Sequence, residues 1–148
     1  MPDYNPSYIS VPSYFLVGVK TIVVGPDGKI LMLKRSEKCS RPHGWDFTGG
    51  SVDKKEDPAK ASVRETKEET DIDSSDPKPL TTYIYTKRKN GKAENVIIIG
   101  YCSKTKSNKV RLTWEHEDYQ WMDASEAQKL KLPKGHHKFL KVFLKQNK

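Results

Sequence analysis

The apolar residues of this chain are gathered in short runs, and most runs have the spacing of β-strands. The most continuous run, residues 95–104 (NVIIIGYCSK), predicts a strand at the centre of a sheet. Turn-forming residues at 25–28 (GPDG) and at Asn90-Gly91 predict hairpins between consecutive strands. In chain order, strands are predicted at residues 14–24, 29–34, 80–87, 95–104 and 119–122, with a further short strand around Val110.

Helices are predicted in three other segments. The first begins after Asp57, whose oxygen can cap free N–H groups, and Pro58 suits the first helical position. The second, at residues 124–130, follows a capping Asp123. The third covers residues 136–146 and packs on the sheet through one apolar face. This face is predicted from the helical spacing of Phe139, Leu140, Phe143 and Leu144.

The order of these elements predicts the fold class. Strands, a helix, more strands and a helix, joined by hairpins instead of regular βαβ units, favour an α/β fold with a mixed sheet between helices. The segments 73–79 and 105–118 are predicted as a loop and a polar connection. Residues 1–13 hold three prolines and no periodic pattern, which indicates an extended arm, and residues 14–148 are expected to form a single domain.

Acidic residues crowd onto the first predicted helix. Glu65, Glu68 and Glu69 stand at i, i+3 and i+4 and therefore share a face, where their repulsion costs stability. Arg64 offsets only part of this charge, and Glu56 adds to it just before the helix. The excess negative charge on oxygen ligands predicts a hard divalent cation. The alternative is a solvated acidic face, against which the regular spacing of these residues argues.

This stretch resembles the box of the Nudix hydrolases, G-x5-E-x7-R-E-U-x-E-E-x-G-U, where U is a bulky aliphatic residue. The matching residues are Gly50, Glu56, Arg64, Glu65, Glu68, Glu69 and Ile72, within a box at 50–72. The segment before the box is similar to the lead-in W-x-F-P-G-G through Trp45, Phe47, Gly49 and Gly50. The resemblance implies an α/β/α sandwich and covers roughly residues 14–132.

Three positions depart from the family pattern, and none of them is a carboxylate of the box. Thr48 replaces the proline of the lead-in. Thr66 replaces an aliphatic residue, and its hydroxyl is expected to bond back to a carbonyl one turn earlier. Asp71 replaces the glycine that ends the helix, where we expect a left-handed conformation at a small stability cost.

The resemblance also implies the metal site. Glu56, Glu68 and Glu69 would bind Mg²⁺ or Mn²⁺ together with the carbonyl of Gly49. Arg64 is expected to play a structural role by pairing with Glu56 or Glu68 and holding their side chains.

The catalytic base remains open at this stage. Glu65 is either a further metal ligand or the base, while some relatives use a glutamate on a late loop, where Glu115 is preferred over Glu117. His116 is expected to cap that loop. Arg35 either holds a substrate phosphate or is an exposed charge at the end of a strand.

Composition limits the setting in which the protein acts. The net charge is +8, and a basic rim around an acidic pocket would attract nucleotides, whereas no recognisable nucleic-acid module favours nucleic acid as a partner. No apolar span or leader is present, so a cytoplasmic protein is expected. Cys39 and Cys102 fit no metal or redox spacing, and His136 and His137 are expected at the surface. A homodimer is left open.

Taken together, these features predict a Mg-dependent pyrophosphohydrolase of the MutT-like branch. Its substrate would be a nucleoside triphosphate or another nucleoside-diphosphate derivative, because markers of other branches are absent from the region after the box. The alternatives are a Nudix-fold sensor that binds a nucleotide without cleaving it and an RNA-end pyrophosphohydrolase. Sensors usually lose box carboxylates, which this chain keeps.

Overall fold

The computed structural model describes residues 6–7 and 14–147. Of the predicted arm at 1–13, all but Pro6 and Ser7 lies outside the described residues. Within 14–147 the strands are β1 (Leu16–Val24), β2 (Ile30–Arg35), β3 (Trp45–Asp46), β4 (Thr48–Ser51), β5 (Ser74–Lys89), β6 (Lys92–Thr105) and β7 (His116–Met122). The helices are α1 (Pro58–Thr70), α2 (Ala124–Ala127) and α3 (Lys134–Gln146).

The strands form one mixed sheet in the order β3-β2-β1-β6-β5, with β4 paired to β1 and β7 paired to β2. β1 and β6 run parallel over the whole length of β1, and the other pairs are antiparallel. The prediction of a mixed sheet is confirmed, and the apolar run of β6 lies inside the sheet, between β1 and β5.

The sheet opens between β1 and β2, because the two strands pair only at Val24 and Ile30. The two strands of the predicted hairpin therefore pair only next to the turn that joins them. Farther along β1, residues 18–21 pair with β4 instead, and β2 pairs with β7. Gly49 permits this close approach, since a Cβ there would lie 2.0 Å from the carbonyl oxygen of Val19.

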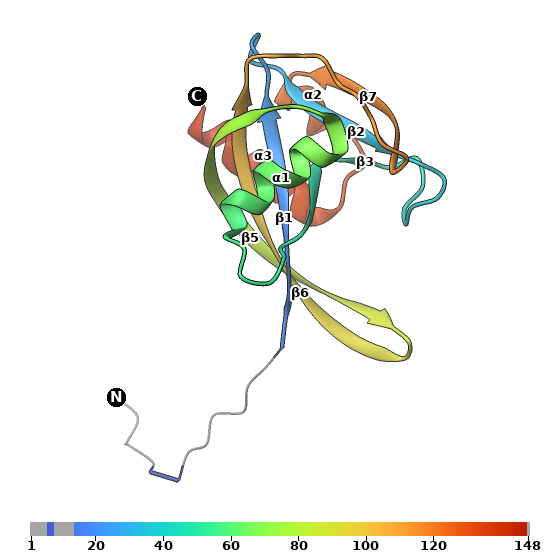
Figure 1. The fold of residues 1–148 in the computed structure, drawn as a ribbon, viewed down its shortest axis with the longest axis vertical. Coiled ribbons are helices and arrows are strands. Elements are labelled where there is room, and N and C mark those ends of the chain that lie inside the picture. The colour runs from blue at the N-terminus through green and yellow to red at the C-terminus, as the bar shows by residue number, and fades with distance from the viewer. Residues whose placement is uncertain (1–5, 8–13, 148) are drawn as a thin grey trace.

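Helices cover both faces of the sheet. In Figure 1, α1 crosses in front of the sheet and α3 lies behind it. The side chains of β1 alternate between the two cores, so that Val19 packs with Ala61 under α1 while Ile22 belongs to the core that contains Phe139 of α3. This is the α/β/α sandwich that the resemblance implied. Among the helices of the described residues, none has the length and apolar character needed to cross a bilayer.

Four local predictions differ from the structure. The predicted loop 73–79 is the irregular start of β5, where two register shifts let the polar segment pair with β6. No strand is assigned around Val110 in the described chain; this segment packs as coil on an apolar cluster. The predicted helix at 124–130 is shorter, because its regular part ends at Ala127, and β7 begins three residues earlier than predicted.

Candidate functional site

The box segment forms a loop and a helix whose two ends have defined caps. At the start of α1, the Asp57 side chain accepts a hydrogen bond from the Ala59 N–H at 2.8 Å, and Pro58 occupies the first turn. At its end, Asp71 has φ 60° and donates its N–H to the Lys67 carbonyl. Both predictions for these ends are confirmed. The caps therefore fix where the box helix begins and ends.

Arg64 organises three of the four box carboxylates. Its Nε donates to Glu56 at 2.7 Å, and its Nη1 lies 3.1 Å from both Glu65 and Glu68. A further Nη2 bond goes to the Ser51 carbonyl. The hydrogen bond from Arg64 lowers the pKa of Glu56 to about 2, while the same bond raises the pKa of the guanidinium. The predicted pairing of Arg64 with Glu56 and Glu68 is therefore present.

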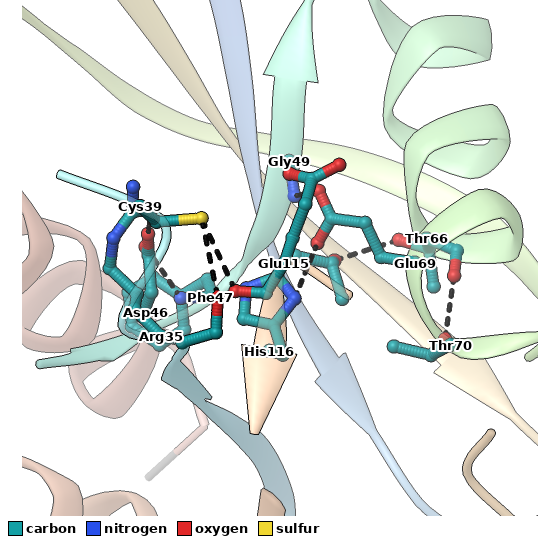
Figure 2. A network of polar contacts seen from close by, with 12 residues as sticks. Arg35, Cys39, Asp46, Phe47, Gly49, Thr66, Glu69, Thr70, Glu115 and His116 are labelled. Carbon is teal, nitrogen blue, oxygen red and sulfur yellow. Dashed lines mark hydrogen bonds and ion pairs between the residues drawn. The ribbon is translucent and has the colours of Figure 1, made fainter. Parts of the chain in front are cut away.

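Glu69 is not among the partners of Arg64, and Figure 2 shows its side chain extending toward Gly49 and His116. The residue is 4% exposed; its Oε1 accepts a 3.3 Å hydrogen bond from the Gly49 N–H, and its Oε2 has no partner among the described residues. Burial raises the pKa of Glu69 to about 8, and the charges of Asp46, Glu115 and Glu65 act in the same direction against the opposing Lys20. A buried carboxylate with a free oxygen is an arrangement that a cation would stabilise.

His116 faces the same oxygen. Its Nδ1 is 3.9 Å from Glu69 Oε2 and is unpartnered within the described chain. Burial lowers the pKa of His116 to about 4, so the ring is neutral near pH 7 and the contact is not an ion pair. The expectation that His116 caps the loop is wrong, because its side chain enters the interior at the start of β7.

The structure separates the two glutamates of the late loop. Glu115 lies beside Glu69 in Figure 2, and its backbone carbonyl accepts hydrogen bonds from Ser36 N–H and Cys39 Sγ. Its charge contributes to the raised pKa of Glu65, for which burial is the main cause. Glu117 points elsewhere and pairs with His43 at 2.6 Å. Glu115 therefore joins the acidic cluster, whereas Glu117 does not.

Two glycines bring the backbone up to these acids. A Cβ on Gly50 would lie 2.5 Å from the Glu65 carboxylate, so the absence of a side chain makes room for that group.

The described residues hold no ready-made cluster of three side chains in metal-binding geometry, because Glu56 and Glu68 are turned onto Arg64. The donor set itself fits a hard cation: it is made of carboxylates beside a glycine backbone, and one buried oxygen of Glu69 lacks a partner in the described chain.

Sequence reasoning missed a second charged cluster, centred on Asp46 at the end of β3, between the partly buried Trp45 and the buried Phe47. Asp46 is fully buried, and one of its oxygens contacts Lys20 at 2.9 Å, Arg35 at 2.9 Å and Arg41 at 3.4 Å. Burial raises the pKa of Asp46, but the charge of Lys20 and the hydrogen bond with His136 outweigh burial and hold this pKa well below its usual range. An acidic residue flanked by two aromatic residues was the available signal.

The cluster also explains the positions of two side chains that contact Asp46. His136 is 2% exposed, so the predicted surface position is wrong. Its Nε2 lies 2.5 Å from Asp46, and its ring stacks on Phe47 with the centroids 5.1 Å apart. Arg35 is not an exposed strand end, because its guanidinium contacts Asp46 and Ser40 and keeps only 19% of its side chain exposed.

Two of the departures from the family pattern meet in space. Thr66 Oγ1 donates to the Ser62 carbonyl at 2.8 Å, which confirms the predicted bond to the preceding turn. The same oxygen is 2.8 Å from Thr48 Oγ1, and both hydroxyls are buried. Each buried hydroxyl gives the other a hydrogen-bond partner. The two threonines together therefore avoid the free-energy cost of one buried hydroxyl without a partner.

Comparison with known proteins covers nearly the whole domain. Residues 15–143 match the model of the NUDIX domain family. Among curated proteins, the chain is 40% identical over 67 residues to a CMP-5'-(N-acetyl-N-hydroxy-3-aminopropyl)phosphonate hydrolase of Streptomyces rubellomurinus, which is 45% of this chain and 32% of that protein. It is 33% identical over 60 residues to the CTP pyrophosphohydrolase of Escherichia coli, which is 40% of this chain and 44% of that protein. The chain thus matches less than half the length of either relative.

Solved structures share the fold of this chain over a longer part of its length than the curated relatives match. A MutT protein from Methanosarcina mazei aligns with a TM-score of 0.76 at 24% identity and covers 94% of this chain and 99% of its own. A MutT NUDIX hydrolase from Burkholderia pseudomallei aligns with a TM-score of 0.69 at 26% identity and covers 88% and 98%. The family match over residues 15–143, together with the box residues described above, shows that this chain belongs to the NUDIX domain family.

Proposed function

We propose that residues 14–148 form one Mg²⁺- or Mn²⁺-dependent pyrophosphohydrolase domain of MutT-like type. It cleaves a phosphoanhydride bond in a nucleoside triphosphate or another nucleoside-diphosphate derivative in the cytoplasm. The observation that supports this function best is the inward-turned Glu69 carboxylate, with one free oxygen in the described chain, among Glu65 and Glu115. Relatives named as nucleotide hydrolases support the same reaction class.

In this proposal, the box residues have two roles, to bind the metal ion and to orient the metal ligands. Glu56, Glu68, Glu69 and the Gly49 carbonyl would hold the ion, which would supply the positive charge that neutralises the diphosphate and polarises its oxygens. Arg64 orients the side chains of Glu56 and Glu68. Because phosphoanhydride hydrolysis needs little covalent work from side chains, positioning of these oxygens is the main contribution of the protein.

The attacking water needs a group that accepts its proton. Glu65 and Glu115 are the two proposed bases: both belong to the acidic cluster, and the raised pKa of Glu65 brings its carboxylate nearer to the operating pH. Arg35 stays the proposed contact for a substrate phosphate, since part of its guanidinium remains exposed beside the site. Its bonds to Asp46 and Ser40 would hold it in a fixed orientation.

The test is a hydrolysis screen with purified protein, Mg²⁺ and a panel of nucleoside triphosphates and nucleoside-diphosphate derivatives. Cytidine nucleotides come first, because both curated relatives are named after them. We expect turnover of at least one compound and a loss of at least about 100-fold in Glu68→Gln and Glu69→Gln, since even residues behind a metal ligand are worth 10–100-fold.

The matched control is Glu117→Gln, which removes an acid of the same loop that pairs with His43 outside the cluster. It should retain activity, while Glu65→Gln and Glu115→Gln identify the base by the larger loss in kcat. Full activity of Glu68→Gln would contradict the proposed metal site. A panel in which no compound is cleaved and one binds tightly would favour a non-catalytic sensor instead.

A further inference from the structure

The hairpin of β5 and β6 extends well beyond the body of the protein, as Figure 1 shows at the end opposite to the C-terminus. The two strands pair without interruption from Thr81 and Gly100 to Lys89 and Lys92. β1, the neighbour of β6, begins at Leu16 opposite Val96, so the described hairpin beyond this point consists of two strands only. Asn90 and Gly91 close it with φ values of 51° and 75°.

One face of β5 carries an ordered series of side chains. Because pairing is regular from Thr81 to Lys89, alternate residues point to the same side, and these are Tyr83, Tyr85, Lys87 and Lys89. We call these four residues the β5 track. The tyrosine rings are 6.0 Å apart, and Tyr83 also packs on Phe139 of α3 at 5.2 Å. Tyr85 is 42% exposed, so one stacking surface of the track is open to solvent.

The inner end of the β5 track lies next to the charged cluster of the site. Tyr83 is opposite Ile98 on β6, which in turn is opposite Gly18 on β1. The next position on the same face of β1 is Lys20, whose Nζ contacts Asp46. The series of side chains therefore runs from the edge of the candidate site outward along the hairpin.

The charge of the hairpin is predominantly positive. Its distal part, residues 86–95, contains Lys87, Arg88, Lys89 and Lys92 with Glu94 as the single acid. Lys87 lies 3.8 Å from Glu94, whereas Lys89 is paired with another lysine, Lys92, across the strands. Two copies of the chain that met through this face would bring like charges together. A polyanion is instead complementary to it.

We propose that the β5 track binds single-stranded nucleic acid, with a base stacked on Tyr85 and backbone phosphates on Lys87 and Lys89. An exposed aromatic ring followed by basic side chains on the same sheet face suits such strands, because every base has a stacking face and every nucleotide a phosphate. The bound strand leads toward Lys20 and the acidic cluster. This binding is additional to the hydrolysis of mononucleotides and does not depend on it.

The test measures fluorescence anisotropy of a labelled oligonucleotide of about 12 nucleotides, as RNA and as DNA, at a series of salt concentrations. Lys87→Ala/Lys89→Ala is compared with Arg88→Ala/Lys145→Ala. The control removes the same charge from the opposite face of β5 and from the far end of α3. Circular dichroism and mononucleotide hydrolysis confirm that each variant is folded.

We expect the track variant to bind about 10-fold more weakly and to lose about 1.4 from the slope of log affinity against log salt, since each phosphate contact to a single strand contributes about 0.7. Tyr85→Ala should weaken binding by at least about fivefold, and the matched Ile84→Ala on the other face should not. Mononucleotide turnover should stay within about twofold in all four variants.

Three outcomes would overturn the proposal. The first is equal weakening by the control pair, which would show attraction by net charge alone. The second is no measurable binding by the unmodified protein at low salt. The third is a dimer in sedimentation experiments that Tyr85→Ala dissociates, which would make a second copy of the chain the occupant of this face. None of them bears on the hydrolysis screen, so the two proposals fail separately.

Discussion

Replacing Asp46 by asparagine tests the physical account of the buried charged cluster. The substitution keeps the size of the side chain and one oxygen that can accept the Phe47 N–H at 2.8 Å. It removes the negative charge that lies 2.9 Å from both Lys20 and Arg35. Two cations and the buried His136 then lack the anion around which they are arranged.

The magnitude follows from burial. Removing one partner of a buried ion pair typically costs about 3–5 kcal/mol, because the other charge stays desolvated. The side chains of Lys20 and Arg35 are 17% and 19% exposed, so water can reach them in part, and the lower end of this range applies. We expect the free energy of unfolding to fall by about 3 kcal/mol, equivalent to roughly 6–12 °C in Tm for a chain of this size.

The assay is urea unfolding of both proteins between neutral and acid pH. The pKa of Asp46 is lowered in the folded state, so its contribution is complete above the ordinary value of 3.8 and is lost as the pH falls through the folded pKa. The difference between the two proteins should therefore be constant near neutral pH and should shrink below about pH 4. When Lys20 is replaced by methionine, Asp46→Asn should lower the free energy of unfolding by at least about 0.5 kcal/mol less than it does in the unmodified protein.

Glu117→Gln is the control, since this carboxylate is partly exposed in its pairs with His43 and Lys34. It should change the free energy of unfolding by no more than about 0.5 kcal/mol. The reasoning is refuted if Asp46→Asn costs no more than this control. It is also refuted if the cost of Asp46→Asn stays the same at pH values where the carboxylate of the unmodified protein is protonated.

Three further substitutions test other parts of the site. Thr66→Val should lower the free energy of unfolding by about 1–2 kcal/mol, because it leaves the buried Thr48 hydroxyl without its best partner; in a double-mutant cycle the pair should couple by about 1 kcal/mol, and additive effects would contradict the contact. Asp71→Gly should raise stability by about 0.5 kcal/mol in thermal unfolding, since φ 60° suits glycine; a lower Tm would show that the contacts with Lys67 matter more. Gly50→Ala should reduce kcat by about tenfold in the hydrolysis assay, because the new Cβ displaces the Glu65 carboxylate; unchanged kcat would remove Glu65 from the site.

The box helix was predictable because its signals are local. Asp57 caps the first turn, Asp71 ends the last, and the spacing of Glu65, Glu68 and Glu69 places all three on adjacent positions of the helix surface. The longer strands β1, β2 and β6 were predictable for the same reason, from local patterns over a few residues, whereas the short strands β3 and β4 were not predicted. The prediction of a loop at residues 73–79 failed, because pairing with β6 through two register shifts makes most of this polar segment part of a strand.

The sequence by itself therefore determined the box helix, the longer strands, the family pattern, the set of candidate acids and the pairing of Arg64 with Glu56 or Glu68. Only the tertiary structure decided that Glu69, one residue from Glu68, turns inward to Gly49. Likewise, the tertiary structure brings Asp46 into contact with Lys20, which lies 26 positions earlier in the chain, and with His136, which lies 90 positions later. The reason is physical, since local spacing sets the direction of a side chain, whereas its burial and its partners depend on which distant segments the folded sheet brings beside it.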